Sequence, residues 1–251
     1  MVAVSWLWLA AGLGFSPVLL ELVAHMAREP WARYASIFVP LAGILLASAR
    51  RGPPRYDGLL LVVLAIGWEL VAIDLRSAPL ARPALVLAAI GLCRLGGVAC
   101  WPRLLLVAWV VPVPTMLQQR LSPAAEQLWT EWAAALAPFA PQVEGHVLVA
   151  ASGSLSIGAA QGGLPLAALL SGCVWASVAA RDGSLARCLL AALAAALLAV
   201  PIQIAALWIA MAGLALGSLE FARWTLAPGA WMVVGGMTLA WLRSGGSRRW
   251  R

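Results

Sequence analysis

The chain has 251 residues, of which 63% are hydrophobic and only 11% are charged, and its formal net charge is +7. A soluble domain carries roughly 25% charged and 45–50% apolar residues, so this composition predicts an integral membrane protein with several spans. All 17 positively charged residues are arginines, and they lie at the ends of apolar segments rather than in one polar patch. That distribution is typical of membrane topology signals and argues against a nucleic-acid-binding protein.

The start of the chain, MVAVSWLWLAAGLGF, lacks a charged n-region and a cleavage site, and therefore predicts a retained first span instead of a cleaved signal peptide. Apolar runs bounded by charges predict about eight transmembrane helices in a single all-α membrane domain that covers residues 1–251. The expected spans are residues 5–25, 35–49, 58–74, 81–97, 103–117, 161–180, 188–213 and 227–242. Several are shorter than the ~20 residues of a perpendicular helix, so their ends must extend into the flanking residues.

The arginines also predict the orientation of the chain, because cytoplasmic loops are enriched in positive charge. Eleven arginines fall on the predicted inner side, namely Arg50, Arg51, Arg55, Arg94, Arg103, Arg181, Arg187, Arg243, Arg248, Arg249 and Arg251. Six fall on the outer side, namely Arg28, Arg33, Arg76, Arg82, Arg120 and Arg223. Both termini are therefore expected in the cytoplasm. The Ala, Leu, Trp and Arg-only composition is typical of a GC-rich bacterium and predicts its inner membrane.

Residues 118–160 form a long outer segment between the fifth and sixth expected spans. One helical face of its first part carries only apolar residues, namely Leu121, Ala124, Ala125, Leu128, Trp129 and Trp132. This pattern predicts an amphipathic helix that lies in the membrane interface. The second part alternates apolar and small polar residues around Val147, Val149, Leu155 and Ile157, which predicts a short strand pair. We expect the two parts to form a small extracytoplasmic cap.

Four stretches occur in a defined order: YASIFVPLAGILLASARR (34–51), WVVPVPTMLQQRLSPAAEQL (109–128), VEGHVLVAASGSLSIGAAQGGL (143–164) and AVPIQIAALWIA (199–210). Together they resemble the exosortase/archaeosortase family, membrane-embedded cysteine transpeptidases that process proteins with a C-terminal sorting tail. Tyr34, Val39 and Pro40 match the first family stretch, whereas its His-Gly pair is Ser36-Ile37 here. The resemblance covers residues from about 30 to 240 and implies the exosortase fold.

The catalytic residues of the family are missing at the matching positions. The family has a cysteine nucleophile at the start of the sixth span, an arginine at the outer end of the seventh and a histidine at the start of the eighth. The matching residues here are Gln161, Ala210 and a residue near Thr225, and the asparagine that precedes the family arginine matches Leu207. A carboxamide is a poor nucleophile and a methyl group donates no hydrogen bond, so the resemblance implies a degenerate member without this chemistry.

Two functions follow as alternatives. The first is a non-catalytic binding or structural subunit, a pseudoenzyme that holds a peptide tail or the transmembrane helix of a partner in a protein-sorting complex. The second is an active exosortase-type peptidase or transpeptidase that uses replacement residues, with Ser152, Ser154, Ser156 or Ser218 as nucleophile and His146 as base. The candidate pocket residues are His146, Ser156, Gln161, Gly162, Gly163 and Arg223.

Other reactive groups are expected to have structural roles. Cys93, Cys100, Cys173 and Cys188 form no CxxC pair and lie in or beside apolar segments, so we expect buried thiols and no metal site or cofactor. Glu21 and Glu69 lie within the first and third expected spans. Pairing with an arginine, or reaching the outer interface, is the usual explanation for such acids. The expected surroundings of the chain are membrane lipid and a membrane protein partner.

Overall fold

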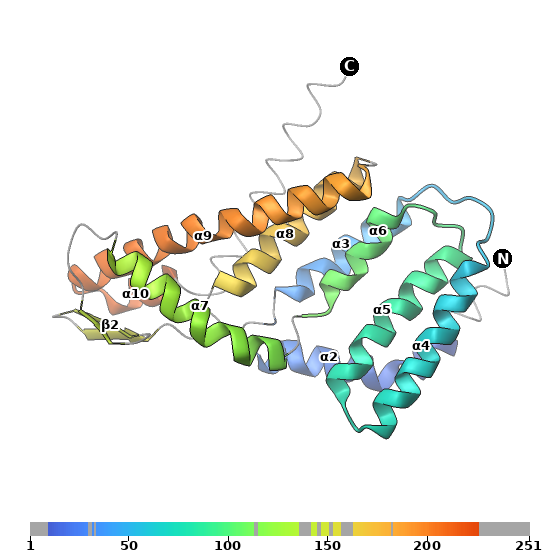
Figure 1. Ribbon diagram of the computed structural model, residues 1–251, viewed down its shortest axis with the longest axis horizontal. Helices are drawn as coiled ribbons and strands as arrows, with labels where there is room; N and C mark the ends of the chain where they lie inside the picture. Colours follow the sequence, from blue (N-terminus) through green and yellow to red (C-terminus); the bar gives the residue numbers. More distant parts are fainter. Residues whose placement is uncertain are drawn as a thin grey trace, which may run out of the picture. The chain divides into compact units, whose positions relative to one another are not determined.

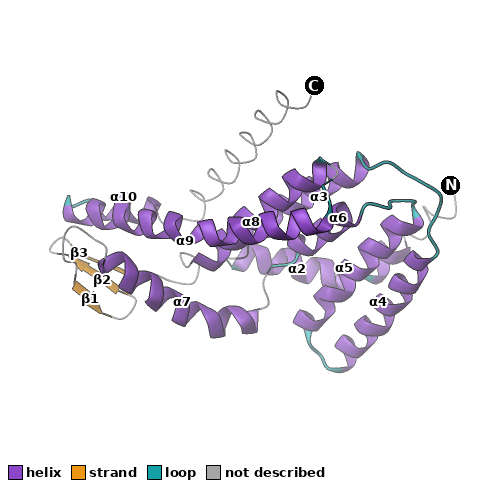
Figure 2. Ribbon diagram, turned by 45° about the horizontal axis from the view of Figure 1, so that its top comes forward, coloured by secondary structure: helices purple, strands orange, loops and turns teal. Residues whose placement is uncertain are grey.

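The computed structural model describes residues 10–29, 32, 34–112, 115–135, 142–144, 147–150, 153–156, 163–181 and 183–225. This part of the chain is mostly helical, as expected, with one small sheet (Figures 1 and 2). It divides into two compact units. The first unit contains Met1–Pro112 and Val178–Cys188, and the second contains Val113–Ser177 and Leu189–Arg251.

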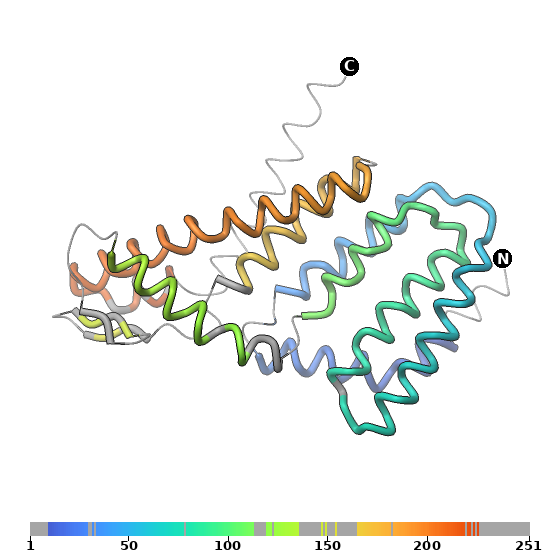
Figure 3. Tube along the Cα trace, in the orientation of Figure 1, coloured from blue at the N-terminus to red at the C-terminus, as the bar shows by residue number. Residues whose placement is uncertain are grey.

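The first unit contains a tightly packed helical hairpin. The helices of this unit are α2 (Ser16–Arg28), α3 (Ala35–Ala47), α4 (Asp57–Asp74), α5 (Ala78–Leu95), α6 (Trp101–Leu105) and the 3-10 helix η2 (Leu106–Val110). The hairpin consists of α4 and α5. In Figure 3, α4 and α5 run side by side along their whole length. A Cβ atom added to Gly58 of α4 would lie 2.4 Å from the carbonyl oxygen of Gly91 on α5, so both positions need glycine for this close approach.

Alanines contribute to two core clusters of the first unit. One cluster joins Phe15 to Ala65, Ala84 and Ala88, and a second joins Val18 to Ala72 and Ala81. These alanines let the helix backbones approach closely, which is the mode of packing that membrane helices use when no hydrophobic effect drives them together.

The second unit combines long helices with the sheet. Its elements are α7 (Thr115–Ala135), β1 (Gln142–Glu144), β2 (Val147–Ala150), β3 (Gly153–Ser156), α8 (Gly163–Ala180), α9 (Leu185–Ala215) and α10 (Leu219–Thr225). The last residues of α8 and the first of α9 belong to the first unit. The three strands are antiparallel in the order β1-β2-β3, with Val143 opposite Leu148 and Val149 opposite Ser154. Strands were expected near Val147 and Leu155, whereas β1 was not predicted.

Five of the expected spans correspond to single helices: residues 35–49 to α3, 58–74 to α4, 81–97 to α5, 161–180 to α8 and 188–213 to α9. The eighth expected span, 227–242, lies outside the described residues. Within the described part of the chain, α9 is the one helix that is by itself long and apolar enough to cross a membrane. Three shorter apolar helices cover Ala35–Ala47, Trp101–Val110 and Pro165–Ala180. The arrangement of eight spans therefore stays a prediction.

The first and fifth expected spans are wrong as continuous helices. The helix that contains residues 10–14 is interrupted at Phe15, and α2 then continues to Arg28, beyond the expected end at residue 25. Pro17 has no N–H to donate to the carbonyl group of Leu13, and the Ser16 hydroxyl donates to that carbonyl instead, at 2.7 Å.

The fifth expected span, 103–117, is divided by prolines. The helical residues end at Val110, and Val111 has an extended conformation. Pro112 follows directly, and a proline disfavours the helical conformation of the residue before it. The helix α7, which was expected to lie in the membrane interface, then begins at Thr115, three residues before the expected start of the outer segment at 118.

Candidate functional site

The exosortase-like site is expected at the end of the second unit that contains the sheet, which we call the sheet end. Here β1 packs against α7 and β3 packs against α10. Figure 1 shows α10 beside the sheet at the carboxyl end of α9. The indole Nε1 of Trp208 on α9 donates a hydrogen bond of 2.8 Å to the carbonyl oxygen of Ala133 on α7. Segments that are far apart in the sequence therefore meet at this end.

A tight turn between α9 and α10 positions the residues that follow α9. The N–H of Ser218 donates to the carbonyl of Gly213 at 2.9 Å, which closes the carboxyl end of α9. The hydroxyl of Ser218 then accepts a hydrogen bond from the N–H of Phe221 at 3.3 Å and caps α10. α10 was not predicted, although Gly217-Ser218 followed by Glu220 in the first turn is a recognisable signal of a helix end and a helix start.

The candidate residues on α10 have different surroundings. Arg223 is exposed and belongs to the helix that contacts β3. The Thr225 hydroxyl donates a hydrogen bond of 2.9 Å to the carbonyl of Phe221 within the same helix. The Thr225 hydroxyl group is therefore occupied by a hydrogen bond within its own helix, whereas the guanidinium group of Arg223 is accessible to a ligand.

The positions that match the family Asn and Arg are packed into the interior. Ala210 and Leu207 are both 0% exposed, one turn apart on the same face of α9. Gln203, one further turn away, is also fully buried and is the polar residue of this face. None of these three residues is a cation. This face of α9 therefore contributes packing, and it offers no positive charge that could stabilise the oxyanion of a transpeptidation reaction.

Of the remaining candidate residues, His146, Gln161 and Gly162 lie outside the described residues. Ser156 is the last residue of β3 and pairs with Val147 across the sheet. Gly163 is the first residue of α8. The structure thus brings the strand that ends at Ser156 together with the helix of Arg223, and it does not describe the chain between Ser156 and Gly163.

The described residues of the sheet end contain neither cysteine nor histidine, so they offer no thiol nucleophile at the place where the resemblance expects one. Cys173 lies within α8 and is fully buried, and Cys188 is fully buried near the start of α9. Both cysteines are free, as are Cys93 and Cys100. A buried thiol without an accessible surface cannot attack a peptide carbonyl group.

Part of the predicted apolar face of α7 is exposed. Leu121, Leu128 and Trp132 are exposed, whereas Glu126 and Thr130 are buried. The Thr130 hydroxyl donates a short hydrogen bond of 2.6 Å to the carbonyl of Glu126. The inward orientation of these two polar residues was not predicted from the local pattern, which indicated only where the apolar face of the helix lies.

The two acids within expected spans differ in their environment. Glu21 pairs with the buried Arg82, whose Nη2 lies 2.9 Å from Oε1 and whose Nε lies 3.3 Å from Oε2. This confirms pairing with an arginine for Glu21, and the pair links α2 to α5. Glu69 lies half-buried on α4. Among the described residues, no group of three or more His, Cys, Asp and Glu residues is arranged to hold a metal ion.

Comparison with known proteins adds no relative. No protein-family model matches this chain, and neither a curated protein nor a solved structure matches it. The resemblance to exosortases consequently rests on the four sequence stretches and their order, and the family of this chain stays a prediction.

Proposed function

We propose that the chain is a multi-pass membrane protein with an exosortase-like fold that acts as a non-catalytic binding or structural subunit. The observation that carries this proposal is the burial of Ala210 and Leu207 on α9, where the family has its Arg and Asn. Its ligand would be a C-terminal peptide tail or the transmembrane helix of a partner protein. Its location would be a bacterial inner membrane, with both termini in the cytoplasm.

The exposed apolar side chains support the membrane location. On α4 they surround much of the helix and include Leu59, Leu60, Val63, Leu64, Ile66, Trp68, Leu70, Val71 and Ile73. On α9 they include Leu189, Leu190, Leu193, Leu197 and Leu198. A soluble monomer rarely exposes continuous apolar surfaces of this extent, whereas lipid covers them without cost. The 18 residues of α4 span about 27 Å, close to the ~30 Å hydrocarbon core of a bilayer.

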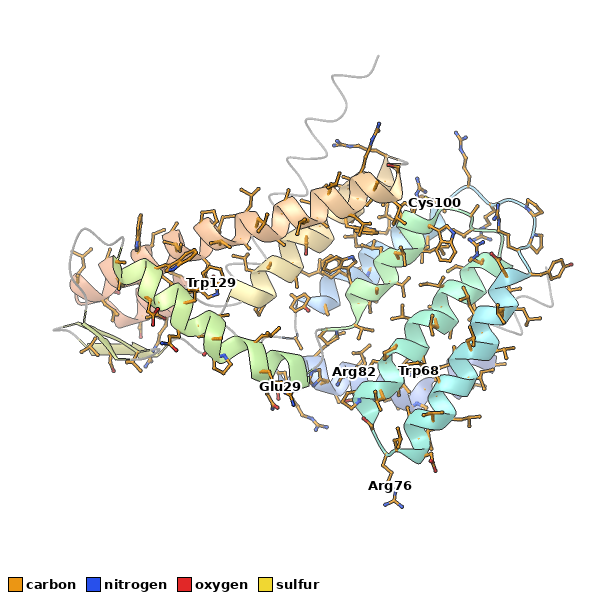
Figure 4. The ribbon with its side chains drawn as sticks, in the orientation of Figure 1. Glu29, Trp68, Arg76, Arg82, Cys100 and Trp129 are labelled. Atoms are coloured by element: carbon orange, nitrogen blue, oxygen red, sulfur yellow. The ribbon has the colours of Figure 1, made fainter. Side chains whose placement is uncertain are left out.

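The arginines of the first unit support the proposed orientation. Arg94 and Arg103 lie where α5 ends and α6 begins, together with the connection that contains Arg50, Arg51 and Arg55. In Figure 4, Cys100 marks this end, and Arg76 and Arg82 lie toward the opposite end of the hairpin. This distribution follows the positive-inside rule if the end with more arginines faces the cytoplasm.

Loss of the catalytic groups supports a binding role over transpeptidation. The reaction of the family needs a thiolate that forms an acyl-enzyme, a base that activates it and a donor that stabilises the oxyanion. Removing the nucleophile alone costs roughly 10⁶-fold in kcat in a serine protease. Gln161 and Ala210 stand at the first and last of these positions, so the retained scaffold would hold a ligand without cutting it.

The test is a cleavage assay with the full chain, purified in mild detergent, and membrane proteins that carry hydrophobic C-terminal tails. We expect binding with no tail cleavage above the rate of a reaction without protein. Cleavage that disappears in both His146→Ala and Ser156→Ala variants would contradict the proposal and establish the alternative peptidase. Variants at Thr225, whose hydroxyl bonds within its own helix, serve as the matched control.

A further inference from the structure

A buried arginine stands at the end of the first unit where α4 begins and α5 ends, which we call the arginine end. The Arg94 side chain is 3% exposed, and its Nη2 donates to the Oδ2 atom of Asp57 at the start of α4. The Trp101 ring covers the guanidinium group, with 4.4 Å between Cζ and the ring centroid. The Nε and Nη1 atoms of Arg94 are buried and have no hydrogen-bond acceptor in the part of the chain that the structure describes. Two unused donors on a buried cation indicate a missing anionic partner.

The backbone holds two more arginines close to Arg94. Arg51 and Val98 form an antiparallel bridge, and the N–H of Gly52 donates to the carbonyl of Gly97 at 2.8 Å. The N–H of Arg55 donates to the carbonyl of Arg94 itself at 3.2 Å. Gly97 has a φ of +85°, and a Cβ atom there would lie 2.2 Å from the carbonyl oxygen of Gly52. Glycine at this position therefore allows the connection between α3 and α4 to lie against the end of α5.

The charge of the arginine end is strongly positive. Arg50, Arg51 and Arg55 are exposed, and among the described residues Asp57 is the carboxylate that pairs with Arg94 at this end. The Asp57 side chain is 52% exposed and engages one nitrogen of Arg94, so it neutralises this group only in part. A ligand for this place must carry negative charge and accept several hydrogen bonds, as a phosphate group does.

Apolar surface begins within one turn of the same residues. Leu59 and Leu60 follow Asp57 on α4 and are exposed, and Val63 continues this face. Trp101 is 41% exposed beside Arg94, as is typical of an indole at a membrane interface. Free inorganic phosphate would use only the arginines, whereas a phospholipid would use the arginines and the apolar face together.

We propose that the arginine end binds the phosphate group of an anionic phospholipid, whose acyl chains lie along the exposed face of α4. Arg51 and Arg55 bind the phosphate oxygens from the surface, and the half-exposed Trp101 side chain moves aside so that the buried Nε and Nη1 donors of Arg94 reach the same oxygens. Basic pockets between helices on the cytoplasmic side of membrane proteins bind anionic headgroups in this manner. This inference rests on the proposed membrane location, and it is independent of the proposed loss of catalysis.

Native mass spectrometry of the full chain, purified in detergent and stripped of lipid, provides the test. Dioleoyl-phosphatidylglycerol, dioleoyl-phosphatidylcholine and inorganic phosphate are added back separately. We expect phosphatidylglycerol to bind at least about tenfold more tightly than phosphatidylcholine. The double variant Arg51→Gln/Arg55→Gln should weaken phosphatidylglycerol binding about 25-fold, since each arginine near anionic lipid contributes about fivefold.

Arg76→Gln is the matched control, because Arg76 is exposed at the other end of the α4–α5 hairpin and should leave binding unchanged. Arg94→Gln should abolish the preference for phosphatidylglycerol, and the double variant keeps the test decisive if this protein fails to fold. Equal binding of the two lipids, or equal effects of the double variant and Arg76→Gln, would overturn the inference. Saturation by inorganic phosphate with no lipid preference would overturn the lipid as the source of the phosphate.

Carbonate extraction of membranes that contain the chain separates this inference from the proposed function. Recovery of the chain in the extracted supernatant would contradict the membrane location itself. Retention in the membrane pellet without a preference for phosphatidylglycerol would overturn the lipid site alone.

Discussion

The two units stabilise their buried polar side chains in different ways. In the first unit, Arg82 and Arg94 bind carboxylates on other helices, so that charged pairs connect α5 to α2 and to α4. In the second unit, Thr130 and Ser171 bond to carbonyl groups of their own helices. Charged pairs therefore fix the position of one helix relative to another in the first unit. In the second unit, these hydroxyl groups form hydrogen bonds within their own helices and connect no two helices.

This difference indicates which helix contacts depend on charged side chains. Such a charged pair cannot lose its carboxylate without leaving a buried arginine unpaired. The face of α9 with Leu207 and Ala210 contains no such pair, so neutral residues there leave the packing complete. The described structure thus combines charged pairs between helices in the first unit with buried hydroxyl groups in the second unit that bond to their own helices.

Breaking the Arg82–Glu21 pair tests the first half of this comparison and has the largest expected effect. Glu21→Gln leaves the buried Arg82 guanidinium without its carboxylate and should lower the free energy of unfolding by about 3 kcal/mol, the lower end of the range for buried pairs because Glu21 itself is 37% exposed. Thermal unfolding in detergent measures this loss of stability. Arg76→Ala, at an exposed position, is the control, and equal losses in the two variants would contradict a role for the pair.

The close approach of α4 and α5 gives the next largest effect. Gly58→Ala places a methyl group against the backbone of α5 and should lower the free energy of unfolding by about 1–3 kcal/mol. Gly67→Ala on the same helix meets no atom within 4 Å, and it should raise stability by up to about 1 kcal/mol because alanine favours helix. Denaturant titration measures the free energy of unfolding of both variants. A lower free energy of unfolding for Gly67→Ala would contradict the expected gain from helix propensity.

In the second unit, one hydrogen bond is expected to hold α7 against α9. Trp208→Phe keeps the aromatic packing and removes the Nε1 donor to Ala133, with an expected loss of about 1 kcal/mol. Hydrogen exchange should accelerate in the carboxyl-terminal half of α7. Unchanged exchange there would mean that apolar packing alone positions the helix.

The smallest effect is the pH dependence of the arginine end. The hydrogen bond from Arg94 holds the pKa of Asp57 below its usual value of 3.8. The ionised carboxylate therefore contributes stability above about pH 3.8, and this contribution disappears as the pH falls through the lower pKa of the folded state. Calorimetry measures the melting temperature at pH 5 and at pH 3, a window of about two pH units that includes the expected transition. Between these two values, the melting temperature of Asp57→Asn should decrease less than that of the unaltered protein. Parallel decreases would show that Asp57 is not responsible.

Much of the helical content was predictable from local patterns. Long apolar runs bounded by charges gave α4, α5 and α9 nearly to their ends, since apolar length and flanking charge are local properties. The interruption at Phe15 was missed although Pro17 is visible in the sequence, because a proline in the first turn is also compatible with a continuing chain. The prolines at 112 and 114 carried a clearer signal, and the expected fifth span ran through them.

The candidate site was less predictable because it depends on contacts between distant segments. The sequence could align Ala210 with a family arginine, and its burial follows from the packing of α9 within the second unit. The inward orientation of Glu126 and the pairing of Arg51 with Val98 depend on neighbours that no local pattern identifies. His146 and Gln161 lie outside the described residues, so their proposed roles rest on the sequence.

The most direct test of the binding role is isolation of the full chain from its native membranes in mild detergent, followed by intact mass measurement of every protein that accompanies it. We expect a membrane protein in a stoichiometric complex, with its C-terminal tail uncut. Recovery of partner proteins that have lost their C-terminal tails, in amounts that fall when His146 is replaced by alanine, would contradict a non-catalytic subunit.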